Sequence, residues 1–229
     1  MRSIGPKIQR NRGPCSVARC TRMREGLGRY CKGHRDARRR YGHPEGRRVC
    51  RKEFVQERLD VARLFKGNPE HEGVANAGIW LQAWIDAAGH GDRTVPGHLD
   101  LSRLYRHGVG ATDALIELCA LWLYFERRRL PDDERLTVAL ARGLMYLAPR
   151  DALKTYACRN RKSQFYRKPT REALADIGNH ARLHLALLFV NVVQAIREHE
   201  VAERDARTAL GAPFTNAPFR KRQRKARAP

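Results

Sequence analysis

Three cysteines and one histidine near the N-terminus have the spacing of metal ligands. They form the pattern Cys-x4-Cys-x10-Cys-x2-His, made by Cys15, Cys20, Cys31 and His34. Zinc takes four such ligands in a tetrahedron, and each close pair supplies two of them from one turn. Because four protein ligands fill the shell, we expect a structural zinc site and not a catalytic one. His43 and Cys50 are substitute ligands if His34 is not used.

The alternative interpretation is a set of free thiols in a basic tail. The segment up to about residue 50 is rich in Gly and Arg and poor in apolar residues, so it cannot close a hydrophobic core alone. Metal binding would supply the folding free energy that it lacks. In a reducing compartment, clustered Cys with His indicates a metal site and not a disulfide framework. The later Cys119 and Cys158 lie in helical patterns and are interpreted as small core residues.

An arginine-rich segment, RDARRRYGHPEGRR, follows the last two ligands. A short helix beginning near His34 would carry Arg35, Arg38 and Arg39 on one face. A guanidinium group binds two acceptors at once, which suits phosphate and the edge of guanine. We therefore predict nucleic-acid contacts at Arg35, Arg38, Arg39, Arg40, Arg47 and Arg48.

These residues resemble the small zinc fingers of bacteriophage and mobile-element proteins, which often accompany HNH homing-type endonucleases. The resemblance covers about 30 residues and rests on Cys15, Cys20, Gly28, Cys31, His34, Arg38, Gly42 and Pro44. It implies that the finger binds DNA and positions a partner domain. It says nothing about the rest of the chain.

The formal net charge of +22 is concentrated at the two ends of the chain. Residues 1–52 hold 17 Lys and Arg against 3 Asp and Glu, and residues 212–229 hold 6 against none. The remainder holds 23 against 21. A nearly neutral body with basic ends is typical of a protein that binds a polyanion. Solubility and binding to a membrane surface are the alternative explanations.

Two further basic stretches are predicted to contact nucleic acid. YACRNRKSQFYRKPTR, at 156–171, mixes base with aromatic residues that could stack on unpaired bases. Its predicted contacts are Arg159, Arg161, Lys162, Arg167, Lys168 and Arg171. The C-terminal FRKRQRKARAP would follow phosphates without reading sequence, through Arg220, Lys221, Arg222, Arg224 and Lys225.

Hydrophobic periodicity predicts a mainly α protein with three regions. These are a basic zinc-finger module at 1–50, an all-helical, bundle-like domain at 51–211 and a disordered basic tail at 212–229. Expected helices span 53–65, 74–88, 98–107, 113–128, 130–147, 151–159 and 169–202, with Thr112 as an N-cap. In the first of these, Phe54, Leu59, Ala62 and Phe65 are expected to face inward. The only strands expected are a small hairpin in the finger.

The helical region contains no persuasive catalytic constellation. Asn179-His180 resembles part of an HNH motif, but it lies in a helical pattern and lacks the ββα context. Asp176, His180 and His184 could share a helix face, more often as a polar stripe than as a metal site. No Walker loop, dinucleotide-binding glycine pattern or Gly-x-Ser-x-Gly motif occurs. The balance therefore leans away from an enzyme.

The sequence as a whole favours a zinc-finger DNA-binding protein, an accessory or regulatory factor of a phage or mobile element. The first alternative is an RNA-binding or ribonucleoprotein component, because charge alone does not separate DNA from RNA. The second is a nuclease or recombinase with an unrecognised active site. We expect a cytoplasmic, nucleoid-associated protein that has no membrane partner and whose helical domain could bind another protein. No apolar run reaches the roughly 20 residues of a membrane span.

Overall fold

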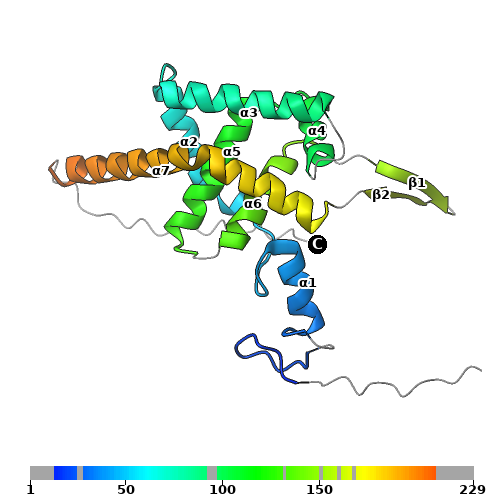
Figure 1. Cartoon of the computed structure of the whole chain (residues 1–229). Helices are drawn as coiled ribbons and strands as arrows, with labels where there is room; N and C mark the ends of the chain where they lie inside the picture. The colour runs from blue at the N-terminus through cyan, green and yellow to red at the C-terminus, as the bar shows by residue number, and fades with distance from the viewer. Residues whose placement is uncertain are drawn as a thin grey trace, which may run out of the picture.

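The computed structural model describes residues 13–24, 28–91, 97–130, 133–149, 152–158, 161–166 and 169–209 (Figure 1). This part of the chain is mainly α, as predicted. Its helices are α1 (Lys32–Tyr41), α2 (Val55–Gly67), α3 (Glu72–His90), α4 (His98–Arg106), α5 (Ala111–Arg127), α6 (Asp133–Met145) and α7 (Arg171–Ala209). A short 3-10 turn at Arg51–Glu53 precedes α2, and the strands β1 (Ala152–Cys158) and β2 (Arg161–Tyr166) lie between α6 and α7.

Helix α5 is the centre of the helical body. It contacts α2, α3, α6 and α7, which surround it in Figure 1. Its apolar side chains are buried around most of its circumference, including Leu115, Leu118 and Leu123. A helix that is apolar on nearly all sides is stable only inside a core, so this segment determines how the other helices assemble. None of the described helices has the length and hydropathy that crossing a bilayer would require.

The inward face of α2 differs from the prediction. Leu59 is 52% exposed, whereas Val61 is fully buried and Phe65 is nearly so. Phe54 is also buried, but it lies just before the helix, which begins at Val55. The expectation was wrong at Leu59 because this residue lies five positions after Phe54, on the opposite side of the helix, whereas Val61 and Phe65 lie seven and eleven positions after it, close to whole helical turns.

The starts of two helices are set by different capping groups. Thr112 is not the N-cap of α5: the extended residue is Gly110, whose carbonyl accepts a hydrogen bond from the Ala114 N–H at 3.2 Å. Thr170 does cap α7, since its Oγ1 accepts the Ala173 N–H at 3.1 Å. The long last helix is confirmed and extends to Ala209.

The prediction of a helix at 151–159 is wrong. Residues 152–158 and 161–166 form an antiparallel hairpin with Tyr156 opposite Ser163 and Cys158 opposite Arg161. The pairing register shifts between Ala152 and Lys154, which marks a bulge. Figure 1 shows the hairpin projecting from the helical body. The backbone groups of a strand form their hydrogen bonds with a neighbouring strand. Here the pairing of β1 with β2 outweighs the helical preference of Ala and Lys.

The finger has a small apolar cluster of its own. Cys15, Val17 and Cys31 are buried, with Cys20 and Tyr30 packed against them, apart from the large core of the body. In Figure 1 the finger and α1 lie to one side of the helical body. The finger's own cluster is small, so a metal ion bound inside it would contribute to its folding.

Candidate metal centre and basic hollow

The four predicted zinc ligands meet in space. The ligating atoms of Cys15, Cys20, Cys31 and His34 all lie within 4.8 Å of one another, and none of the cysteines is in a disulfide. Zn–S bonds of about 2.3 Å in a tetrahedron would hold sulfurs about 3.8 Å apart, so the group needs only a small contraction around an ion. The donor set of three thiols and one imidazole fits zinc or a similarly soft metal. The site can bind a metal ion, and four protein ligands would leave it closed.

Local structure places each half of the site. The first half is a turn closed by the Cys20 N–H on the Val17 carbonyl at 3.1 Å, at the tip of a hairpin bridged between Pro14 and Met23. Arg19 adopts φ 61° in this turn. The second half is the start of α1, where Cys31 is the N-cap residue and His34 lies in the first turn.

Contacts between the two halves already favour a thiolate. The Cys15 Sγ lies 3.2 Å from His34 Nδ1 and accepts the Cys31 N–H at 3.3 Å. Burial opposes ionisation of Cys15, but the hydrogen bonds from His34 and from backbone N–H groups outweigh it and lower its pKa to about 6. For Cys20, the Arg22 N–H favours the thiolate, yet burial and the neighbouring cysteines raise the pKa. The Cys15 thiol therefore ionises more readily than an ordinary cysteine, which favours binding of a cation.

The substitute ligands lie outside this cluster. Cys50 is exposed and belongs to the segment before α2, and His43 Nδ1 accepts the Glu45 N–H at 3.1 Å in a turn. Cys119 is buried in the body core, and burial raises its pKa, as expected for a small core residue. Cys158 is on β1, where only the backbone is described.

The arginines after His34 gather at a concave surface that we call the basic hollow. It has a volume of about 390 Å³ and is lined by Gly28, Arg29, Tyr30, Arg35, Arg38, Arg39 and Arg171. Three of its arginines come from one face of α1, as predicted, while Arg171 comes from the first turn of α7. Arg29 was not among the predicted contacts, although its place beside Tyr30 and just before the third cysteine was a signal that it belongs with the finger.

One carboxylate joins the two sides of the basic hollow. Glu134, near the start of α6, lies 3.6 Å from Arg38 and 2.5 Å from Arg171. Among the described residues, no carboxylate is within ion-pair distance of Arg29 or Arg39. The Arg38 guanidinium also lies 5.8 Å from the centre of the Tyr30 ring. The hollow therefore keeps a large excess of positive charge over negative charge.

The finger helix ends against the body. Gly42 follows α1 with φ 79° and donates its N–H to the Arg38 carbonyl at 2.9 Å. A Cβ atom on Gly42 would lie 2.5 Å from the Glu134 carbonyl oxygen, so only glycine allows this approach. The Arg142 Nε, from α6, donates to the Arg40 carbonyl at 3.0 Å.

The remaining predicted arginines of the finger lie outside the basic hollow. Arg40 is exposed on α1, outside the lining of the basic hollow. Arg47 forms a two-point ion pair with Glu53, at 2.9 and 2.6 Å. The Arg48 guanidinium lies over the Tyr146 ring, 4.4 Å from its centre. The structure therefore does not bring Arg40, Arg47 and Arg48 together with the basic hollow.

The other predicted contacts cannot be placed as side chains. Arg161 and Lys162 are on β2, where only the backbone is described. The predicted contacts that lie outside the described residues are Arg159, Arg167, Lys168, Arg220, Lys221, Arg222, Arg224 and Lys225.

The polar stripe on α7 packs on tryptophans. His180 and His184 have ring centres 4.4 Å apart and lie 4.7 Å from Trp84 and Trp80, respectively. Burial and the neighbouring His184 lower the pKa of His180, with Asp176 opposing them. In the part of the chain that is described, only the finger gathers three or more ligand residues. His180 and His184 thus form an aromatic stack with Trp80 and Trp84 between α3 and α7.

Comparison with known proteins gives no matching family, no matching characterised protein and no matching solved structure.

Proposed function

We propose that this protein is a zinc-stabilised nucleic-acid-binding factor that prefers DNA over RNA, and that it acts as an accessory or regulator for a phage or mobile element. The basic hollow is the observation that carries this proposal. It concentrates five arginines within one concave surface, of which Arg38 and Arg171 pair with Glu134. Arginine forks bind phosphate oxygens in pairs, and such contacts supply most of the affinity for a polynucleotide.

The metal centre supports this role by placing the arginines. Cys31 and His34 fix the start of α1, and α1 carries Arg35, Arg38 and Arg39. Zinc is the ion we propose, because it favours a closed site of three thiolates and one imidazole. The phage or mobile-element origin rests on the resemblance of the finger to those proteins.

The proposal is tested by measuring affinity for a duplex DNA, a single-stranded DNA and an RNA of equal length at several salt concentrations. We expect the duplex to bind most tightly. If about six phosphates are contacted, the logarithm of the association constant falls against log salt with a slope of roughly −5. Arg39→Gln should weaken binding and make the slope less steep by about 1.

The control is Arg63→Gln. The Arg63 side chain is 69% exposed on α2, outside the basic hollow, and it lies 3.9 Å from Asp60. It should bind like the wild type. An affinity that does not respond to salt would eliminate nucleic acid as the partner, and tighter binding of RNA would favour the ribonucleoprotein alternative.

A further inference from the structure

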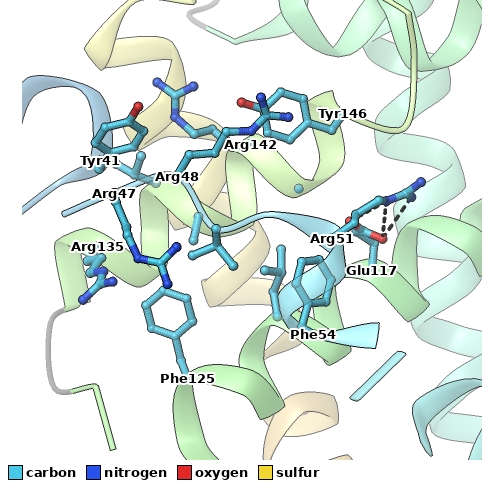
Figure 2. Close-up of a pocket in the computed structure, with 15 residues that line it drawn as sticks. Tyr41, Arg47, Arg48, Arg51, Phe54, Glu117, Phe125, Arg135, Arg142 and Tyr146 are labelled. Atoms are coloured by element: carbon cyan, nitrogen blue, oxygen red, sulfur yellow. Dashed lines mark hydrogen bonds and ion pairs between the residues drawn. The ribbon is translucent and has the colours of Figure 1, made fainter. Parts of the chain in front are cut away.

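A second cavity lies where the segment between the finger and the body crosses α5 and α6. We call it the linker pocket (Figure 2). Its volume is about 220 Å³. It is lined by Tyr41, Arg47, Arg48, Val49, Arg51, Phe54, Glu117, Leu121, Phe125, Arg135, Val138, Ala139, Arg142, Gly143 and Tyr146. No residue is shared with the basic hollow, so this is a separate site.

The floor of the linker pocket is apolar. Phe54 and Phe125 are 2% and 3% exposed, and Leu121 and Val138 are also buried. Figure 2 shows the two phenylalanine rings beneath the arginines. A ligand that reaches this floor must therefore present a flat or compact apolar body.

Among the described residues that line the pocket, Glu117 is the only acid, and it is already neutralised. Glu117 is 1% exposed, and its carboxylate accepts hydrogen bonds from Arg51 Nε and Nη2 at 3.0–3.2 Å, drawn as dashed lines in Figure 2. Arg58 Nε lies 3.0 Å from the same carboxylate. Two guanidinium groups thus share one buried charge, and the site keeps a net positive charge.

Two arginines at the rim are held in place without a carboxylate partner among the described residues. Arg48 lies over the ring of Tyr146, and Arg142 lies 5.4 Å from the centre of the Tyr41 ring. The hydrogen bond of Arg142 to the Arg40 carbonyl uses Nε and leaves its terminal nitrogens for other acceptors. Ring contacts orient a guanidinium group and leave its charge unneutralised.

We propose that the linker pocket binds a small organic oxyanion, a carboxylate or phosphate ester attached to an aromatic or compact apolar body. The oxyanion would accept hydrogen bonds from Arg48 and Arg142, and the apolar body would lie on Phe54, Leu121 and Phe125. The volume is below the roughly 300 Å³ of pockets for drug-sized ligands, so the body is about one ring in size. This inference does not depend on the proposed function, because it uses none of the residues of the basic hollow.

The test is calorimetric titration of the full-length protein with four probes. These are benzoate, phenyl phosphate, inorganic phosphate and benzyl alcohol. Benzoate and phenyl phosphate should bind, and inorganic phosphate should bind at least about tenfold more weakly because it lacks the apolar body. Benzyl alcohol should not bind measurably. The two aryl probes distinguish a carboxylate site from a phosphate-ester site by their relative Kd values.

Variants locate the binding. Arg48→Gln should raise the Kd for the tighter aryl anion at least about tenfold, since it removes a charged donor. Ala139→Leu fills the pocket without changing charge and should also prevent binding, which keeps the test valid if one variant folds poorly. Arg39→Gln, in the basic hollow, is the matched control and should leave the Kd unchanged.

Three results would overturn the proposal. The first is that neither aryl anion binds the wild-type protein at millimolar concentration. The second is that benzyl alcohol binds as tightly as benzoate, which would show that the pocket recognises the apolar body and not the anion. The third is that Arg39→Gln abolishes binding of the aryl anion while Arg48→Gln and Ala139→Leu retain it, which would place the anion in the basic hollow.

Discussion

Cys31 has two roles in the finger, because it is both a metal-ligand candidate and the N-cap residue of α1. Its N–H donates to Cys15 Sγ, and its carbonyl accepts the Arg35 N–H at 2.9 Å. Metal binding at this residue therefore orders the hairpin and the first turn of the arginine helix together.

Cys31→Ser should remove the metal. We expect about one zinc per wild-type chain and almost none in the variant, measured by elemental analysis of freshly reduced protein. Most of the far-ultraviolet helix signal should remain, because α2 to α7 have their own core. Cys50→Ser, at an exposed cysteine outside the cluster, should retain the zinc. Loss of all helix signal in Cys31→Ser would show that finger and body fold as one unit.

Glu117→Gln should destabilise the body. The change keeps the shape of the side chain and removes the buried charge that Arg51 and Arg58 share. Because both arginines are partly exposed, we expect a loss of about 1–3 kcal/mol in the free energy of unfolding, measured with urea. Glu126→Gln, at the exposed pair with Arg197, should change it by less than about 1 kcal/mol. Equal effects of the two substitutions would contradict the importance of burial.

Single residues also show what sequence reasoning can find. The four ligands were predictable because their chemistry is specific and their spacing is local. The linker pocket was not predictable. Its arginines at 47–51 meet Glu117 and Arg142 from positions about 66 or more residues away, and no local pattern encodes that meeting.

At the level of elements, the helices followed from apolar periodicity, whereas the hairpin at 152–166 did not. Its sequence alternates weakly, and its Lys, Arg and Ala residues are as compatible with a helix as with a strand. Pairing between β1 and β2 decided the outcome. The inward face of α2 was also misjudged at Leu59, which lies off the buried stripe of Phe54, Val61 and Phe65.

The contact between α6 and α7 depends on a glycine. A Cβ atom on Gly178 would lie 2.1 Å from the Thr137 carbonyl oxygen, which is backbone and cannot rotate away. We expect Gly178→Ala to force the helices apart and to cost about 1–3 kcal/mol of unfolding free energy, visible as a lower Tm. Gly67→Ala is the control, since nothing lies within 4 Å of the added atom. It should be neutral or slightly stabilising, and a Gly178 variant with the same behaviour would refute the close packing.

For the whole molecule, Glu134 competes with any anion for the basic hollow. It contacts Arg38 from the finger helix and Arg171 from α7, so a bound phosphate must displace it or share its partners. Glu134→Gln should raise the affinity for duplex DNA severalfold at low salt, because it removes a repulsive charge beside the phosphates. The gain should shrink as salt increases.

The matched control is Glu126→Gln, which removes a carboxylate with the same charge change on the far end of α5. It should alter DNA affinity less than Glu134→Gln does. If both variants gain equally, only the total charge of the protein matters and the basic hollow has no special role.

Helix α7 fixes the distance between the basic hollow and the far end of the helix. It runs without interruption from Arg171, at the basic hollow, to Ala209, which at 1.5 Å per residue is about 58 Å. The last six basic residues of the chain follow its far end. A duplex lying parallel to this rod would extend for about 17 base pairs between the two ends, at about 3.4 Å per pair. If the protein binds duplex DNA as proposed, oligonucleotides shorter than that span would contact the basic hollow without reaching the far end of α7.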